Sequence, residues 1–98
     1  MKAISVALLL LISAFSIKAQ NQDSLMQVQY ASALKKLEAN NLNDAVIQFT
    51  QLINSNFSNK EVYVKRGVAY AKQQQYEKAK ADLDEAVKAR INTAELFE

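Results

Sequence analysis

The sequence has no cysteine, histidine, proline or tryptophan, and it contains a single glycine among its 98 residues. Without cysteine there is no disulfide framework, so side-chain packing must hold the fold together. Without cysteine or histidine, the chain has no thiol nucleophile, no histidine-based triad and none of the commonest transition-metal ligands. One glycine cannot supply a glycine-rich nucleotide-binding loop. The sequence therefore predicts a protein that is not an enzyme and that holds no cofactor or metal.

Proline and glycine interrupt helices, so their scarcity leaves the helical patterns of this chain unbroken. Asp23 or Ser24 is expected to cap a first helix, and Ser58 with Glu61 forms a capping-box pattern at the third. Asn40-Asn41 and Gln74-Gln75 mark the turns within the two helix pairs. Apolar residues at helical spacing predict an all-α fold with helices over about 24–39, 43–54, 60–73 and 76–90.

The N-terminus has a composition of its own. Lys2 precedes an apolar run over residues 3–17, which is shorter than the ~20 residues of a membrane-spanning helix. Lys18 and Ala19 follow it, so we interpret residues 1–19 as a signal peptide cut after Ala19. Ile17 is an unusual residue two places before the cut, so the cleavage site is placed to within a residue or two. An uncleaved anchor or a buried helix is the alternative. The sequence predicts export to the periplasm or the cell exterior, with residues 20–25 as a short polar leader.

Charge gives no reason to expect an anionic partner. Lys2 and Lys18 account for the net charge of +2, and the rest of the chain carries equal numbers of basic and acidic residues. The basic pairs Lys35-Lys36 and Lys65-Arg66 lack interleaved aromatic residues, so we interpret them as ordinary surface. We expect no nucleic-acid partner and no membrane contact after signal cleavage.

The sequence repeats itself once. A shift that places residue 26 on residue 60 lays residues 26–59 on residues 60–93 without a gap, and we call this shift one period. A fixed period of this size is typical of repeat arrays, which mostly bind other molecules. Small residues let the two helices of a repeat approach, with Gly67 marking a close contact, and larger ones fill the space around them. The equivalent pairs are Ala33 and Gly67, Leu42 and Tyr76, Ala45 and Ala79, Phe49 and Leu83, Leu52 and Ala86, and Ile53 and Val87.

These residues resemble the tetratricopeptide repeat. The second repeat carries the family pattern at Tyr63, Gly67, Tyr70, Tyr76, Ala79, Leu83 and Ala86, and the first carries it at Ala33, Leu42, Ala45 and Phe49. Gln29 replaces the expected aromatic residue, and Phe57 and Ile91 replace the closing proline. The resemblance implies an α-solenoid of two antiparallel helix–turn–helix repeats, 26–59 and 60–93. Residues 94–98 would start a truncated third repeat, capped by Thr93 and with Phe97 in the place of Tyr63.

In the resembled family, the first helices of the repeats line a concave groove that holds a partner segment. The apolar character of these positions favours a hydrophobic segment of a protein partner. The alternative is that Leu34, Leu37 and Val68 belong to the core. The positions carried over are Gln27, Tyr30, Leu34, Leu37, Glu38, Glu61, Val64, Lys65, Val68, Ala71 and Lys72.

Three acidic residues, Asp82, Asp84 and Glu85, are the only candidates for carboxylate chemistry or cation binding. A solvated, ion-paired helix face is the simpler interpretation. Lysines at helical spacing would supply the partners: Lys78 for Asp82, and Lys80 and Lys88 for Asp84.

The sequence thus predicts an exported protein–protein interaction module without catalysis. The alternative is an N-terminal fragment or accessory region of a longer envelope complex or enzyme. Nothing in the pattern covers the outer face of the fourth helix, or Leu96 and Phe97 beyond it. We therefore expect a homo-oligomer in which two copies pair symmetrically through these C-terminal ends, or a marginally folded monomer.

Overall fold

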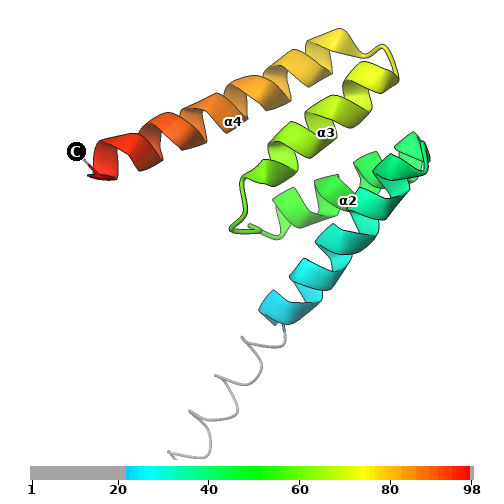
Figure 1. Cartoon of the computed structure of the whole chain (residues 1–98), viewed down its shortest axis with the longest axis horizontal. Coiled ribbons are helices and arrows are strands. Elements are labelled where there is room, and N and C mark those ends of the chain that lie inside the picture. Colours follow the sequence, from blue (N-terminus) through cyan, green and yellow to red (C-terminus); the bar gives the residue numbers. More distant parts are fainter. Residues whose placement is uncertain (1–21, 98) are drawn as a thin grey trace, which may run out of the picture.

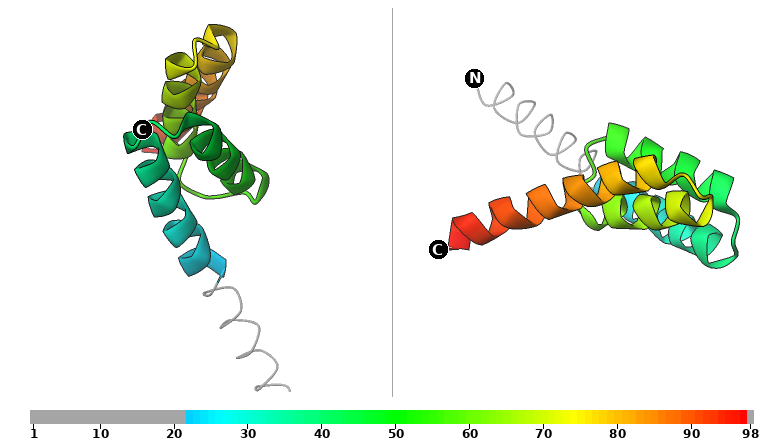
Figure 2. Two further views of the ribbon diagram at one scale, coloured as in Figure 1. Left: turned by 90° about the vertical axis from the view of Figure 1, so that its right-hand side faces the viewer. Right: turned by 90° about the horizontal axis from the view of Figure 1, so that it is seen from above.

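The computed structural model describes residues 22–97, and this part of the chain is all helical, without a strand (Figure 1). The N-terminal helix covers residues 22–38 of this range. It is followed by α2 (Leu42–Asn54), α3 (Glu61–Lys72) and α4 (Tyr76–Phe97). The N-terminal helix and α2 form one antiparallel hairpin, and α3 and α4 form the next (Figures 1 and 2). The predicted all-α fold is confirmed.

The two hairpins are closed by the same turn. Asn40 and Gln74, which lie one period apart, both have left-handed backbone conformations, with φ of 62° and 63°. The Asn41 N–H donates to the Lys36 carbonyl at 2.8 Å, and the Gln75 N–H donates to the Tyr70 carbonyl at 2.9 Å. These bonds satisfy carbonyl groups that the end of a helix leaves without a partner. Both predicted turns are confirmed.

Two expected helix caps are wrong. Residue 22 is already helical, so Asp23, Ser24 and the end of the expected polar leader lie inside the N-terminal helix. At the start of α3, Asn59 Oδ1 accepts a hydrogen bond from the Glu61 N–H at 3.0 Å. Lys60 already has a helical backbone conformation, which places the Asn59 side chain, rather than Ser58, beside the free N–H groups.

The core lies where α3 packs against the first hairpin. Its largest fully buried side chains are Phe49, Leu52, Phe57 and Val62, which come from α2, the following loop and α3. Each such side chain contributes roughly 1.5–3 kcal/mol when removed from water. The rest of the buried cluster consists of Ala33, Leu37, Ala45 and Ala69. The buried cluster therefore extends from the first hairpin through the following loop to α3.

Equivalent residues of the two hairpins differ in burial. Phe49 is fully buried and Leu42 packs against the core, whereas Leu83 is 44% exposed and Tyr76 is 66% exposed. The expectation that Tyr76 fills space inside the fold is therefore wrong. Leu83 does lie beside Gly67, since its Cδ2 is 3.5 Å from a Cβ built there, but it is only partly enclosed. The reason is that α3 covers α2, while no described element covers the outer side of α4. The small residues Ala33, Ala45, Gly67 and Ala79 are buried, as the close approach of paired helices requires.

The expected end of the fourth helix near Arg90 is also wrong, because α4 is one helix as far as Phe97. It extends past the start of α3 (Figure 2). In the first hairpin the chain leaves α2 through Asn56, whose φ is 59°. Arg90 stands at the equivalent position and has no preference for a left-handed backbone, so the helical hydrogen bonds continue. Residues 94–97 extend α4 instead of opening a third repeat, and Thr93 lies inside this helix.

The predicted signal peptide, residues 1–19, lies outside the described residues. Within residues 22–97, no helix combines the length and hydropathy needed to cross a membrane.

Candidate functional site

The N-terminal helix contributes five of the groove residues expected from sequence, and they divide into three groups. Leu37 is only 8% exposed and belongs to the core, so the alternative interpretation holds for it. Tyr30 and Leu34 are half-buried and pack against the core cluster, while Gln27 and Glu38 are exposed. Only Tyr30 and Leu34 thus combine an accessible apolar surface with a fixed position.

Tyr30 packs on two aromatic rings of the first repeat and feels the charge of a residue at the start of α3. Its ring centroid lies 5.4 Å from that of Phe57 and 6.2 Å from that of Phe49. Burial raises the pKa of the Tyr30 hydroxyl, and the negative charge of Glu61 raises it further. The structure therefore brings together two predicted groove residues, Tyr30 and Glu61, from the first helices of the two hairpins.

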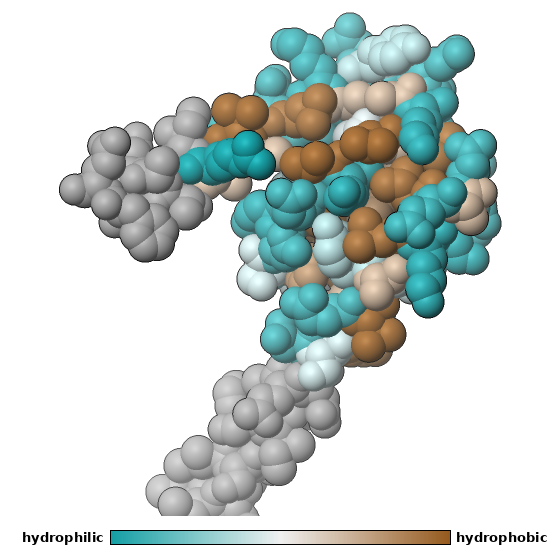
Figure 3. Space-filling model, in the orientation of Figure 1, coloured by the Kyte–Doolittle hydropathy of each residue, from teal (hydrophilic) through white to brown (hydrophobic). Residues whose placement is uncertain are grey.

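The α3 residues of the expected groove form an accessible strip. Val68 is 37% exposed, and Val64 and Lys65 are half-buried. Glu61, Ala71 and Lys72 are exposed. In Figure 3, hydrophobic surface forms a broken band over this side of the molecule and reaches α4. Val68 is therefore surface rather than core.

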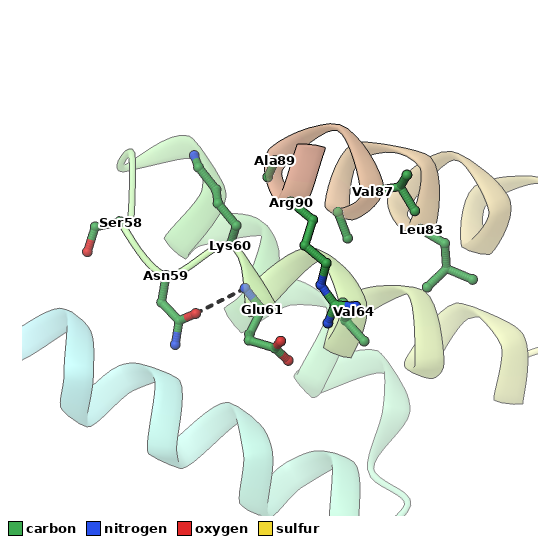
Figure 4. Close-up of a pocket in the computed structure, with 10 residues that line it drawn as sticks. Ser58, Asn59, Lys60, Glu61, Val64, Leu83, Val87, Ala89 and Arg90 are labelled. Atoms are coloured by element: carbon green, nitrogen blue, oxygen red, sulfur yellow. Dashed lines mark hydrogen bonds between the residues drawn. The ribbon is translucent and has the colours of Figure 1, made fainter. Parts of the chain in front are cut away.

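A cavity of about 520 Å³ lies where the start of α3 faces the second half of α4 (Figure 4). Val64 and Leu83 contribute to its apolar wall, and Lys60, Glu61 and Arg90 supply charged groups. Of the expected groove residues, only Glu61 and Val64 line it. The sequence did not single out its remaining members as one site, because they come from a loop and from the far end of another helix. The full lining is Ser58, Asn59, Lys60, Glu61, Val64, Leu83, Ala86, Val87, Ala89 and Arg90.

Asp82 and Arg66 depart most clearly from the sequence interpretation. Asp82 is 4% exposed, and Arg66 donates to both of its oxygens, through Nε at 2.8 Å and Nη2 at 2.6 Å. This hydrogen bonding raises the pKa of Arg66, although burial acts in the opposite direction. Arg66 Nη1 also donates to Thr50 Oγ1 at 3.2 Å. Arg66 is therefore not ordinary surface, and Asp82 is not on a solvated face or paired with Lys78.

The rest of the acidic cluster behaves as a solvated helix face. Lys80 Nζ lies 3.9 Å from Asp84, and Lys88 Nζ lies 3.4 Å from Glu85, with all four side chains at least half exposed. Lys88 therefore pairs with Glu85 instead of Asp84. Among the side chains that the structure describes, no group of acidic residues is arranged to hold a metal ion.

Comparison with known protein families, curated proteins and solved structures found no match to this chain. The similarity to the tetratricopeptide repeat therefore rests on the residue pattern, the repeat period and the equivalent turns at Asn40 and Gln74.

Proposed function

We propose that this chain is an exported, tetratricopeptide-like module that binds a segment of another protein and performs no chemistry. The observation that carries the proposal is the accessible apolar strip on the first helices of the two hairpins. Leu34 and Val64 are half-buried there, and Val68 is 37% exposed. Apolar side chains that are held in place but still reach solvent provide anchor points for a partner.

The chemistry of the partner follows from what surrounds the strip. Glu38 and Glu61 are acidic, Lys65 and Lys72 are basic, and none of these four is buried. A mixed rim of this kind does not select a strongly charged ligand. The partner segment is therefore apolar at its contact positions, with polar residues between them.

A capture experiment with paired variants tests this function. The full chain is used to retain proteins from the envelope fraction of its source cells, and Val68→Asp is compared with Ile47→Asp. Ile47 is 54% exposed on α2, so both variants place a carboxylate at an exposed position on a helix. We expect Val68→Asp to release a partner that Ile47→Asp retains. Equal retention by both variants, or no reproducible partner, would contradict groove binding.

Export is tested separately. N-terminal sequencing of the protein recovered from the envelope should begin at or near Gln20. A chain that retains residues 1–19 would support the uncleaved anchor instead.

A second candidate is an accessory region of a longer envelope complex or enzyme. Leu83 and Val87 favour it, because they are 44% and 56% exposed at the end where a further hairpin would pack. Continued repeats or a catalytic domain in the reading frame after Glu98 would support this candidate, and a stop codon there would exclude it.

A further inference from the structure

Two helices, the N-terminal helix and α4, each expose an apolar face, and they are the first and last helices that the structure describes. On the N-terminal helix, Leu25 is 56% exposed and Val28 is 66% exposed. On α4, Leu83 and Val87 are 44% and 56% exposed. We propose that these two faces bind each other between copies of the chain, so that the protein assembles head to tail. This interaction is additional to partner binding, although Glu61 and Val64 of the partner groove also line the cavity beside the α4 face.

The contact between α2 and α3 within one chain is the template for the proposed contact between copies. Between the hairpins, α3 packs on α2 and buries Val62 to 1% and Ala69 to 0% exposure. Two side-chain hydrogen bonds fix the antiparallel register: Arg66 donates to Thr50 at 3.2 Å, and Gln73 donates to Asn43 at 2.6 Å.

The repeat period shows that both exposed faces are halves of that interface. Val28 lies one period before Val62, which is 1% exposed, yet Val28 is 66% exposed. Leu83 and Val87 lie one period after Phe49 and Ile53, which α3 helps to cover. Each end of the molecule thus presents one side of a contact that the middle of the molecule makes in full.

The cavity is located where the second copy would dock. Val64, Leu83, Ala86 and Val87 line its apolar wall (Figure 4). In the proposed contact, the N-terminal helix of a second copy takes the place of α3, and α4 takes the place of α2. The α2–α3 register, shifted by one period in this way, puts Val28 of the second copy against α4 close to Val87. The cavity volume of about 520 Å³ leaves room for apolar side chains of that helix.

The polar groups at this contact determine its strength. In the transferred register Ser32 faces Asp84, so two polar residues meet where the template has the Arg66–Thr50 hydrogen bond. Lys36 faces Lys80, which lies 3.9 Å from its neighbour Asp84. Because the two lysines repel one another, we expect weak association that strengthens as salt screens them.

The two faces differ, so their contact is heterologous and can repeat without closing. This geometry replaces the symmetrical pairing of C-terminal ends that we expected from sequence.

Sedimentation velocity of the full chain tests the proposal across a range of concentrations. The variants are Val28→Asp and Val87→Asp, with Ile47→Asp as a matched control. Wild type and Ile47→Asp should form species that grow with concentration. Each face variant should weaken association roughly tenfold or more, because it places a charge in an apolar contact. An equimolar mixture of the two variants should form a one-to-one dimer that grows no further, since each retains the face that the other has lost.

Three results would overturn the proposal. The first is a wild-type chain that is monomeric at every concentration. The second is undiminished association in Val28→Asp, which indicates symmetrical pairing through α4 or contact through other residues. The third is a mixture of variants that stays monomeric. Circular dichroism checks that the variants are folded, and Val28→Ser and Val87→Ser replace any aspartate variant that loses helix. Val68→Asp should still assemble, so loss of partner binding and loss of assembly are distinguishable.

Discussion

Arg66 joins three helices through one side chain. It lies on α3, pairs with Asp82 of α4 and donates to Thr50 of α2. Its Cζ also lies 6.0 Å from the ring centroid of Tyr63 and 5.6 Å from that of Tyr70. In the first hairpin, Ser32 and Gln48 take the places of Arg66 and Asp82, and the buried Gln48 Oε1 has no hydrogen-bond partner among the described residues. The second hairpin therefore carries a polar clamp that the first lacks.

Replacing Arg66 with leucine should destabilise the fold strongly. It leaves the buried Asp82 carboxylate without its partner, and breaking one side of a buried ion pair costs roughly 3–5 kcal/mol. Urea denaturation followed by circular dichroism measures the loss, and Arg66→Leu/Asp82→Leu should recover most of it. The exposed Lys80–Asp84 pair is the control, because Lys80→Ala should cost less than about 1 kcal/mol. Losses of equal size at Arg66 and Lys80 would contradict a buried clamp.

Gly67→Ala should stabilise the protein, even though Gly67 lies at a close helix contact. A Cβ built on Gly67 is 3.4 Å from the Ala79 carbonyl oxygen and 3.4 Å from Asp82 Cβ, which is ordinary van der Waals contact. Alanine is preferred over glycine inside a helix by roughly 1 kcal/mol, so we expect a gain of up to that amount in thermal melting analysis. Gly67→Leu should instead lower the melting temperature, since its longer side chain meets α4. A loss in Gly67→Ala would show that the helices are closer than described.

Tyr30 makes the stability sensitive to alkaline pH. Burial and the charge of Glu61 raise its pKa in the folded chain above the usual value of 10.0. The folded state therefore favours the neutral hydroxyl, and this contribution is complete below pH 10 and is lost as the pH rises through the folded pKa. Thermal melts between about pH 8 and pH 11.5 should show a smaller alkaline loss for Tyr30→Phe than for wild type. Identical pH profiles would contradict the environment described for Tyr30.

At the scale of the helices, the turns were predictable and the helix ends were less so. Asn40-Asn41 is a strong turn signal, and Gln74-Gln75 was predicted to be a turn because it lies one period later. The continuation of α4 was not predictable from the repeat, because Arg90 and Ile91 neither stop a helix nor require one. The pairing of Asp82 was also missed. Sequence spacing favours partners on the same helix, whereas Arg66 lies on another helix, far from Asp82 in the sequence.

Gln74→Gly should stabilise the turn between α3 and α4. Gln74 has a φ of 63°, a conformation that costs a side-chain-bearing residue roughly 1–2 kcal/mol. Glycine adopts it freely but loses more entropy on folding, so the expected net gain is about 0.5–1 kcal/mol in urea denaturation. Asn40→Gly, at the equivalent turn, should gain less because asparagine tolerates this conformation. A larger gain at Asn40 than at Gln74 would contradict the shared turn geometry.

At the scale of the whole molecule, the repeat period predicted where the hairpins lie but not which faces stay exposed. Equivalent positions become core or surface according to what packs on them, as Phe49 and Leu83 demonstrate. The candidate groove was predicted in part for the same reason. Leu37 is core, Val68 is surface, and the cavity beside Val64 includes residues that no single-helix pattern joins.

The central claim is that the second hairpin packs on the first as a repeat of the same unit, since both the partner groove and the head-to-tail contact depend on it. Nuclear Overhauser effects of the Val62 methyl groups test it most directly. Val62 is 1% exposed and lies in one cluster with Leu52 and Phe57. The account predicts strong cross-peaks from Val62 to the first hairpin, together with cross-peaks between the Thr50 methyl group and Arg66. Cross-peaks from Val62 only to residues of α3 and α4 would contradict it.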